Sequence, residues 1–453
     1  MLHFFVSIIG IFITIFFVIG THEAAHFIVA RLLNVKVLRF SIGFGKTLWR
    51  TIDKKGTEYV IALIPLGGYV KMLDETEETV AKEELHLAYN TQPFYKKCLI
   101  VIAGPITNIF CAFILYWLIF MIGFTTVKPL IGTVEPHSIA AMAGLKPNQE
   151  IISIDDHPVN AWAGFMLRLL SHAGDNDDAT VDVIHAPSST TQTKHVLDLT
   201  HWELNGLTPD PLLSIGITPY MPNVPLIIGK MADDSPATDA HLQLKDKIIA
   251  INHETIKDWN QVVTLILKHP DDTLSFTLER NNKIIQLPVK IGHERDLFFK
   301  KSGYLGIGPD FTFPKEMLRD IQYGPIAALS AAFRELHDFT YFNLLLIGKL
   351  ITGKLSLQSL GGPITIFDTA GDALNIGLVS FLGFLAFLSV SIGVINFLPI
   401  PGLDGGHLFI QLIEWIIQKP LPEKMLSILY RMGFMLILFV LGIALVNDLL
   451  RLY

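Results

Sequence analysis

The stretch His22-Glu23-Ala24-Ala25-His26 decides how this chain is built, because it places three ionisable groups inside an apolar run long enough to cross a membrane. Residues 4–21 contain no charged residue and no histidine, and the apolar character resumes directly after His26. Each charge buried at membrane depth costs about 2.5–3.5 kcal/mol even on a lenient insertion scale, so such residues indicate a functional site. The stretch therefore predicts a membrane-spanning helix that carries chemistry.

The spacing within this stretch predicts a metal site. Positions i and i+4 lie on one face of a helix, so His22 and His26 can offer two imidazole nitrogens to one tetrahedral zinc ion. Glu23 lies about 100° further round the helix, where it can act on a water at the zinc without binding the metal. HExxH alone is a common chance pattern, and the membrane setting is what favours the metal. The predicted chemistry is peptide hydrolysis.

The composition is that of a membrane protein with soluble parts. Of the 453 residues, 51% are hydrophobic and only 17% are charged. Four spans can be drawn, at about residues 4–33, 99–124, 376–400 and 425–447. A net charge of -7 without a concentrated basic patch argues against a nucleic-acid partner. The surface that the chain is expected to meet is a lipid bilayer.

The positive charges predict the orientation of the spans. Basic residues gather at the inner edges of the first two spans, namely Arg31, Lys36, Arg39, Lys96 and Lys97. The positive-inside rule then places residues 34–95 in the cytoplasm and both termini outside. His22 lies about 27 Å beyond Phe4 along a hydrocarbon core roughly 30 Å thick, so the metal site is expected near the cytoplasmic face. Residues 35–73 alternate in polarity between glycine turns, which predicts a small antiparallel sheet on that side.

An internal repeat divides the soluble stretch between the second and third spans. The run Ile151-Ile152-Ser153-Ile154-Asp155 recurs 97 positions later as Ile248-Ile249-Ala250-Ile251-Asn252. Two copies of one β-rich module explain this repeat. The pattern resembles a PDZ domain, whose general use is to add a peptide strand to a sheet edge. His241 stands where the first copy has Gly144, so we expect a different local loop in the second copy.

A broken helix at the end of the third span predicts the third metal ligand. Prolines and glycines follow Asn396 in quick succession, at Pro399, Pro401, Gly402, Gly405 and Gly406. Irregular backbone at membrane depth is tolerated only where it is buried in protein or lines a cavity. A catalytic zinc usually has three protein ligands, which makes Asp404 the candidate, with His407 as its competitor or as a group behind the ligands. Asn396 is expected either to bind substrate backbone or the developing oxyanion, or to join two helices by a hydrogen bond.

Together these motifs resemble the site-2 protease family of intramembrane zinc proteases, in its form with two PDZ domains. The resemblance covers nearly the whole chain and rests on His22-Glu23-Ala24-Ala25-His26, the PDZ-like modules and Leu403-Asp404-Gly405-Gly406. It implies that His22, His26 and Asp404 bind zinc and that Glu23 is the catalytic base. Gly67-Gly68-Tyr69-Val70-Lys71 resembles the family's membrane-dipping β-loop. The implied substrate contacts are Gly68, Tyr69, Val70, Asn396, Pro399 and Pro401.

The resemblance also implies a location and a substrate class. The expected setting is the bacterial inner membrane, with the PDZ-like modules and both termini in the periplasm. The expected substrates are single-pass membrane proteins, such as an anti-sigma factor or remnant signal peptides. The PDZ-like modules are expected to gate substrate access from outside.

The expected fold is a polytopic α-helical membrane protein with about four transmembrane helices, a small cytoplasmic-side β-sheet and two inserted periplasmic PDZ-like β-rich domains. The predicted divisions are residues 1–126 with the first two helices, the modules at 127–220 and 222–310, amphipathic outer-surface helices at 311–375, and the last two helices at 376–453. Two other classes of protein fit the sequence less well. A zinc or proton transporter would need several sites of His, Glu or Asp along a path, and the second and fourth spans contain none of these residues. A PDZ membrane scaffold would leave the broken segment from Asn396 to Asp404 unexplained.

Overall fold

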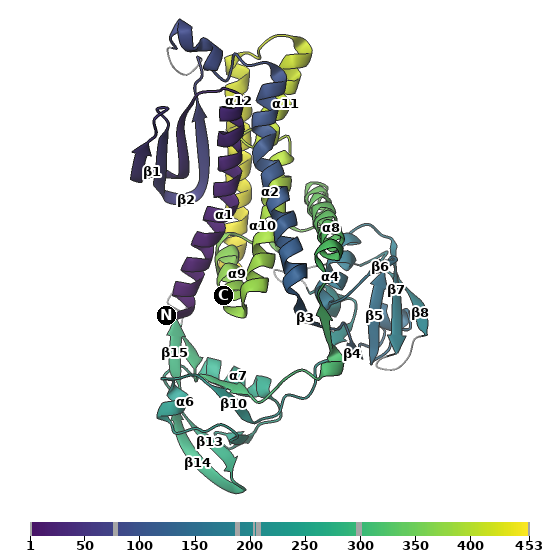
Figure 1. The fold of residues 1–453 in the computed structure, drawn as a ribbon. Helices are drawn as coiled ribbons and strands as arrows, with labels where there is room; N and C mark the ends of the chain where they lie inside the picture. Colours follow the sequence, from purple (N-terminus) through teal and green to yellow (C-terminus); the bar gives the residue numbers. More distant parts are fainter. Residues whose placement is uncertain are drawn as a thin grey trace.

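The computed structural model describes residues 2–75, 80–185, 191–202, 204, 210–295 and 301–451. Among these residues, four helices are long and apolar enough to cross a membrane, namely α1 (Leu2–Leu32), α2 (Phe94–Ile122), α10 (Leu378–Phe397) and α12 (Glu423–Arg451). They form one bundle, and the two chain ends lie toward the same end of it (Figure 1). The prediction of about four spanning helices is confirmed.

Small residues bring the helices of the bundle close together. A Cβ on Gly393 of α10 would lie 3.0 Å from Ile109 and 3.2 Å from the carbonyl oxygen of Pro105, both on α2. A Cβ on Gly10 of α1 would lie 2.9 Å from the carbonyl oxygen of Ala370 in α9 (Pro363–Ile376). In lipid, where helices gain nothing from excluding water, such close backbone approach supplies the packing energy.

A small sheet stands beside α1, built from β1 (Val37–Ile52) and β2 (Glu58–Met72) (Figure 1). Residues 37–42 of β1 lie in the middle, because they pair with residues 58–61 on one side and 68–72 on the other. Residues 47–52 turn back to pair with residues 58–62. Residues 68–72 therefore form an edge with which no other described strand pairs. The antiparallel sheet predicted for residues 35–73 is confirmed, and the position of residues 68–72 at its edge is a finding of the structure.

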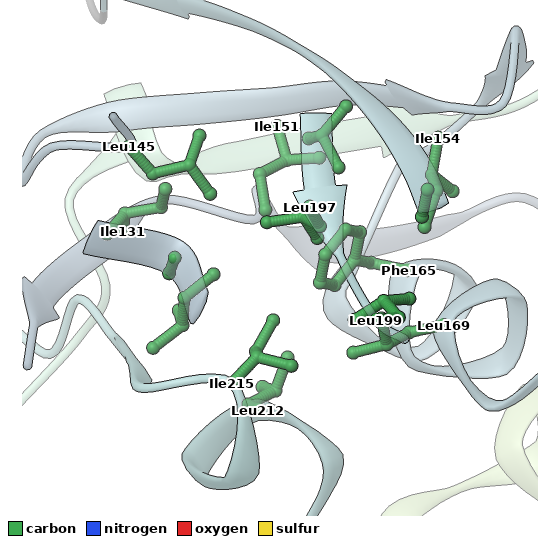
Figure 2. Packing of buried hydrophobic residues seen from close by; sticks show 14 of the residues in the cluster. Ile131, Leu145, Ile151, Ile154, Phe165, Leu169, Leu197, Leu199, Leu212 and Ile215 are labelled. Atoms are coloured by element: carbon green, nitrogen blue, oxygen red, sulfur yellow. The ribbon is translucent and has the colours of Figure 1, made fainter. Parts of the chain in front are cut away.

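The repeated modules share one topology. The first has the sheet order β6-β5-β7-β8 with a second sheet β4-β9, and the second has β12-β11-β13-β14 with β10-β17. The bounds in the first are β4 (Ile131–Val134), α3 (Ile139–Met142), β5 (Gln149–Ile154), β6 (His157–Pro158), α4 (Trp162–Ser171), β7 (Asp178–His185), β8 (Gln192–Asp198), α5 (Pro211–Ser214) and β9 (Ile217–Pro219). Figure 2 shows its apolar core, in which Phe165 of α4 packs among Ile151, Ile154 and Leu197.

The second module repeats this order, except that a hairpin stands where the first module has α5. Its elements are β10 (Ile228–Met231), α6 (Pro236–Asp239), β11 (Lys247–Ile251), β12 (Glu254–Thr255), α7 (Trp259–Lys268), β13 (Thr273–Arg280), β14 (Lys283–Lys290), β15 (Gly292–Arg295), β16 (Lys301–Tyr304) and β17 (Ile307–Pro309). The expectation of a different loop at His241 is wrong. Gly144 has φ 83° and His241 has φ 58°, so both adopt the left-handed conformation. The second copy keeps the loop and accepts the strain of a side chain there.

The two modules form an insertion whose ends meet. β3 (Phe124–Val127), directly after α2, pairs with β18 (Leu318–Ile321), directly before α8 (Pro325–Ile351). Both modules are therefore attached at one end of α2. Figure 1 shows the second module beyond the end of the bundle where the N-terminus lies. The amphipathic helices expected within residues 311–375 correspond to α8 and α9, which pack on α2 and α1 respectively. Their position on the outer membrane surface stays a prediction.

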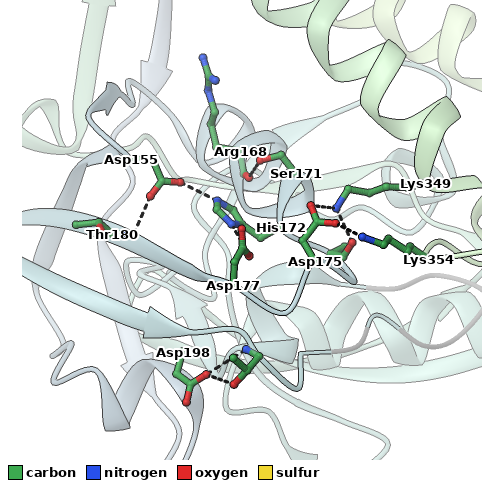
Figure 3. A network of polar contacts seen from close by, with 12 residues as sticks. Asp155, Arg168, Ser171, His172, Asp175, Asp177, Thr180, Asp198, Lys349 and Lys354 are labelled. Atoms are coloured by element: carbon green, nitrogen blue, oxygen red, sulfur yellow. Dashed lines mark hydrogen bonds and ion pairs between the residues drawn. The ribbon is translucent and has the colours of Figure 1, made fainter. Parts of the chain in front are cut away.

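Ion pairs fasten the first module to α8. Arg168 of α4 contacts Asp338 at 2.6 Å. Figure 3 shows the second contact, in which Asp175 forms ion pairs with Lys349 and Lys354 at 2.7 Å each. Burial alone would raise the pKa of Asp175, but the hydrogen bonds from the two lysines outweigh it and hold that pKa below its ordinary value. The Lys349 side chain is only 5% exposed, so removing Asp175 would leave a buried ammonium group without its carboxylate partner.

Candidate active site

Three side chains from two distant segments converge on one point. His22 and His26 come from α1, and Asp404 is the first residue of α11 (Asp404–Ile417). Nε2 of His22 lies 3.0 Å from Oδ2 of Asp404, and Nε2 of His26 lies 3.4 Å from the same oxygen. The two Nε2 atoms are 3.2 Å apart. The three atoms thus form a nearly equilateral triangle.

The dimensions of this triangle fit a zinc ion. Ligand atoms about 2.0–2.1 Å from a tetrahedral zinc are about 3.3 Å from one another, which matches all three edges. Oδ2 of Asp404 is buried and has no hydrogen-bond donor in the described part of the chain. A buried carboxylate oxygen between two imidazole nitrogens is stable only with a positive charge beside it. Among the described residues, this is the one cluster of three or more such groups that could hold a metal.

Helix α2 closes the site from one side and orients the first ligands. Nδ1 of His26 lies 2.7 Å from the carbonyl oxygen of Ile100, to which it donates, and this leaves Nε2 free for the metal. A Cβ on Gly104 would lie 2.3 Å from Nε2 of His26 and 2.7 Å from Nε2 of His22. Only glycine therefore lets α2 pass so close. The interruption of the apolar run at Gly104-Pro105 and Asn108 predicts a kink and close helix contact, and Gly104 makes such a contact, but the sequence did not predict that its partners are the two histidines.

The sheet edge at residues 68–72 lies against Glu23. A Cβ on Gly68 would lie 2.7 Å from Cγ of Glu23, so the missing side chain of Gly68 allows this contact. The triangle, the edge and the end of the third span line a cavity of about 1050 Å³. Its lining includes the predicted residues His22, Glu23, His26, Gly68, Tyr69, Val70, Asn396 and Asp404.

The two predicted prolines lie apart from these residues. Pro399 and Pro401 are in the connection between α10 and α11, and neither belongs to the described lining of the cavity. Pro401 instead meets α12, where a Cβ on Gly433 would lie 1.7 Å from its carbonyl oxygen. The connection therefore packs directly on the fourth spanning helix. A substrate contact at either proline stays a prediction.

Comparison with known proteins identifies the family. Residues 10–440 match peptidase family M50. The chain belongs to this family. The predicted membrane-embedded zinc metalloprotease is thereby confirmed, and the His-His-Asp cluster is consistent with it.

Curated relatives match this M50 peptidase along almost its whole length. The chain is 39% identical over 449 residues to the regulator of sigma-E protease RseP of Salmonella typhimurium, covering 99% of this chain and 98% of that protein. The regulator of sigma-E protease RseP of Escherichia coli is 39% identical over 450 residues, with the same two coverages of 99% and 98%. A solved PDZ domain of the SdrC-like protein from Listeria monocytogenes is 21% identical over 20% of this chain and 93% of that one, with a TM-score of 0.17.

His407 of this M50 peptidase stands outside the triangle. It lies one turn after Asp404 on α11 and lines the same cavity. Its Nδ1 is 3.1 Å from the hydroxyl oxygen of Tyr430 on α12. The geometry therefore favours Asp404 over His407 as the third ligand.

Proposed function

We propose that this M50 peptidase cleaves single-pass membrane proteins at a zinc ion held by His22, His26 and Asp404. The observation that carries the proposal is the triangle of ligand atoms, with edges of 3.0, 3.2 and 3.4 Å, at the wall of a cavity of about 1050 Å³. A transporter would need further ionisable groups along a path, and the described residues hold no second metal cluster. A catalytic centre beside a substrate-sized cavity accounts for both features.

Three groups of the site then have proposed roles, namely Glu23, Asn396 and the Ile100 carbonyl. A zinc ion held by His22, His26 and Asp404 would supply a Lewis acid for a water and for the peptide carbonyl. Glu23 would be the base that takes a proton from the attacking water and delivers it to the leaving amine. Asn396 lines the cavity and is the donor proposed for the substrate backbone or the oxyanion. The Ile100 carbonyl keeps His26 in the tautomer that leaves Nε2 free.

The edge at residues 68–72 is the proposed binding strand for the substrate. A transmembrane helix hides its peptide bonds, so hydrolysis requires a few residues to unwind beside the zinc. No other described strand pairs with this edge, so it can offer backbone hydrogen bonds to such an extended segment, and Gly68 places it against Glu23. Val70→Pro, which removes a backbone N–H, is expected to abolish cleavage and leave zinc content unchanged. Wild-type turnover by a correctly folded variant would rule out strand addition.

The substrates and the orientation follow from the relatives and from the charges. Two relatives are named regulators of sigma-E protease, so we take an anti-sigma factor as the first substrate to test, with remnant signal peptides as the second. The enzyme is placed in a bacterial inner membrane with the sheet in the cytoplasm. The tandem modules and both termini then lie in the periplasm.

In this orientation the tandem modules act before catalysis, as a gate. They follow the outer end of α2 and are distant in sequence from the metal ligands. Ion pairs attach the first module to α8. A steric gate predicts that the intact enzyme cuts a substrate with a short outer stub and spares the same substrate with a folded outer domain. Equal cleavage of both would favour peptide-specific binding by the modules instead.

Two substitutions test the catalytic assignment. Glu23→Gln keeps the shape of the side chain but loses the base, so it is expected to retain zinc and lose cleavage by at least about 100-fold. Asp404→Asn supplies a poor ligand and is expected to lose zinc as well as cleavage. The measurements are metal content of the purified protein and cleavage of a tethered transmembrane substrate. Full zinc occupancy in Asp404→Asn would move the third ligand to another residue, with His407 the first to examine.

A further inference from the structure

Asn108 of α2 is a buried polar residue that the mechanism above does not use. It is 0% exposed within a membrane-spanning helix, where an amide is costly unless it has partners. Its amide nitrogen lies 3.3 Å from Nδ1 of His22. Its amide oxygen has no hydrogen-bond partner among the described residues. Among the described residues, the one hydrogen-bond partner of this side chain is therefore a proposed zinc ligand.

The position of Asn108 on α2 supports a role at the metal site. Ile100, Gly104 and Asn108 are spaced four residues apart, so they share one face of the helix. The first offers a carbonyl oxygen to His26, and the second leaves room for both imidazoles. The third lies next to the far nitrogen of His22. One face of α2 thus meets both histidines.

The position of the proton on the His22 imidazole decides which atom of the Asn108 amide must face His22. Nε2 of His22 points to Asp404 and His26, so this atom must carry the lone pair that binds zinc. A neutral imidazole has one proton, which must then be on Nδ1 and needs an acceptor. An amide nitrogen cannot accept it. Rotating the amide of Asn108 by 180° exchanges its nitrogen and oxygen within the same volume and supplies the acceptor.

We propose that Asn108 is a positioning residue for His22, accepting a hydrogen bond from Nδ1–H through its amide oxygen. This bond fixes the tautomer and the ring plane of His22, as the Ile100 carbonyl does for His26. The amide oxygen gains the partner that it otherwise lacks. The inference rests on the proposed role of His22 as a ligand.

The test measures zinc affinity of the purified full-length protein by competition with a chromophoric chelator. Asn108→Leu keeps the size of the side chain and removes the acceptor, so zinc should bind about 10–100-fold more weakly. Asn108→Asp keeps the acceptor and should stay within about threefold of the wild type. Tyr116→Phe is the matched control, because it removes another buried polar atom of α2 that has no described partner. It should leave zinc affinity unchanged.

A purely structural role for Asn108 predicts a different pattern. Leu would then be tolerated and the buried charge of Asp would be the damaging change, so wild-type zinc affinity in Asn108→Leu overturns the proposal. Equal losses in the Leu and Asp variants overturn it too. Should Asn108→Leu fail to fold, Asn108→Ala carries the same expectation, and the absorption spectrum of bound Co²⁺ reports whether Asp restores the ligand geometry. His22→Ala distinguishes a failure of the ligand assignment from a failure of the role of Asn108. If His22→Ala keeps zinc, His22 is not a ligand. If His22→Ala loses zinc while the Asn108 variants keep it, only the role of Asn108 fails.

Discussion

Gly104→Ala should remove zinc from this enzyme without removing any ligand. The added methyl carbon would lie 2.3 Å from Nε2 of His26 and 2.7 Å from Nε2 of His22, the atoms that face the metal. An ordinary contact begins at 3.4 Å, so the His26 nitrogen would have to retreat by about 1.1 Å. Zinc–ligand distances tolerate changes of only about 0.2 Å. We therefore expect at least a 100-fold loss of zinc affinity and a comparable loss of cleavage.

The assay compares zinc content, zinc affinity and cleavage in Gly104→Ala and in Gly383→Ala. Gly383 lies in the spanning helix α10 and has no atom within 4 Å of its added Cβ, so the same substitution there should change none of these quantities. The melting temperatures of the two variants show whether the helix bundle survives. A folded Gly104→Ala enzyme with wild-type zinc affinity would refute the close passage of α2 over the metal site.

Three further predictions concern the sheet edge, the bundle and the first module. Gly68→Ala would press on Glu23, since its Cβ falls 2.7 Å from Cγ of that residue, and we expect cleavage to fall at least about tenfold with zinc retained, by the same two assays. Asp448 of α12 accepts from the backbone N–H groups of Gly362 at 2.8 Å and Ile364 at 2.9 Å at the start of α9, so Asp448→Ala should destabilise the bundle by about 2 kcal/mol, measured by unfolding in detergent. The lowered pKa of Asp175 means that its charge stabilises docking on α8 at neutral pH, and this is lost as the pH falls below about 4 toward the folded pKa. A spin-label distance between α4 and α8 should lengthen at acid pH, and in Asp175→Asn already at neutral pH. A distance that is unchanged in that variant would contradict the docking role.

Local patterns were sufficient to predict much of the fold and part of the site. The spans are long uncharged runs, the sheet is an alternation of polar and apolar residues bounded by glycines, and the repeat is the same short pattern shifted by 97 positions. Each can therefore be recognised from a short stretch of sequence. His22, Glu23 and His26 belong to one helix, whose periodicity alone places the two histidines on a common face. Asp404 was predicted because a broken helix at membrane depth requires a reason.

What the sequence by itself determined, then, is everything that depends on the conformation of a single segment: the spanning helices, the paired histidines and the two modules. The tertiary structure decided what depends on contact between segments. The ligand triangle closes only because α11 begins beside α1, and Gly104 matters only because α2 crosses at the metal. Gly68 reaches Glu23, and Asn108 reaches His22 across 86 positions of sequence, through packing that no local pattern encodes. Periodicity specifies which face of a helix a residue occupies, whereas the neighbour of that face is chosen by the packing of the whole bundle.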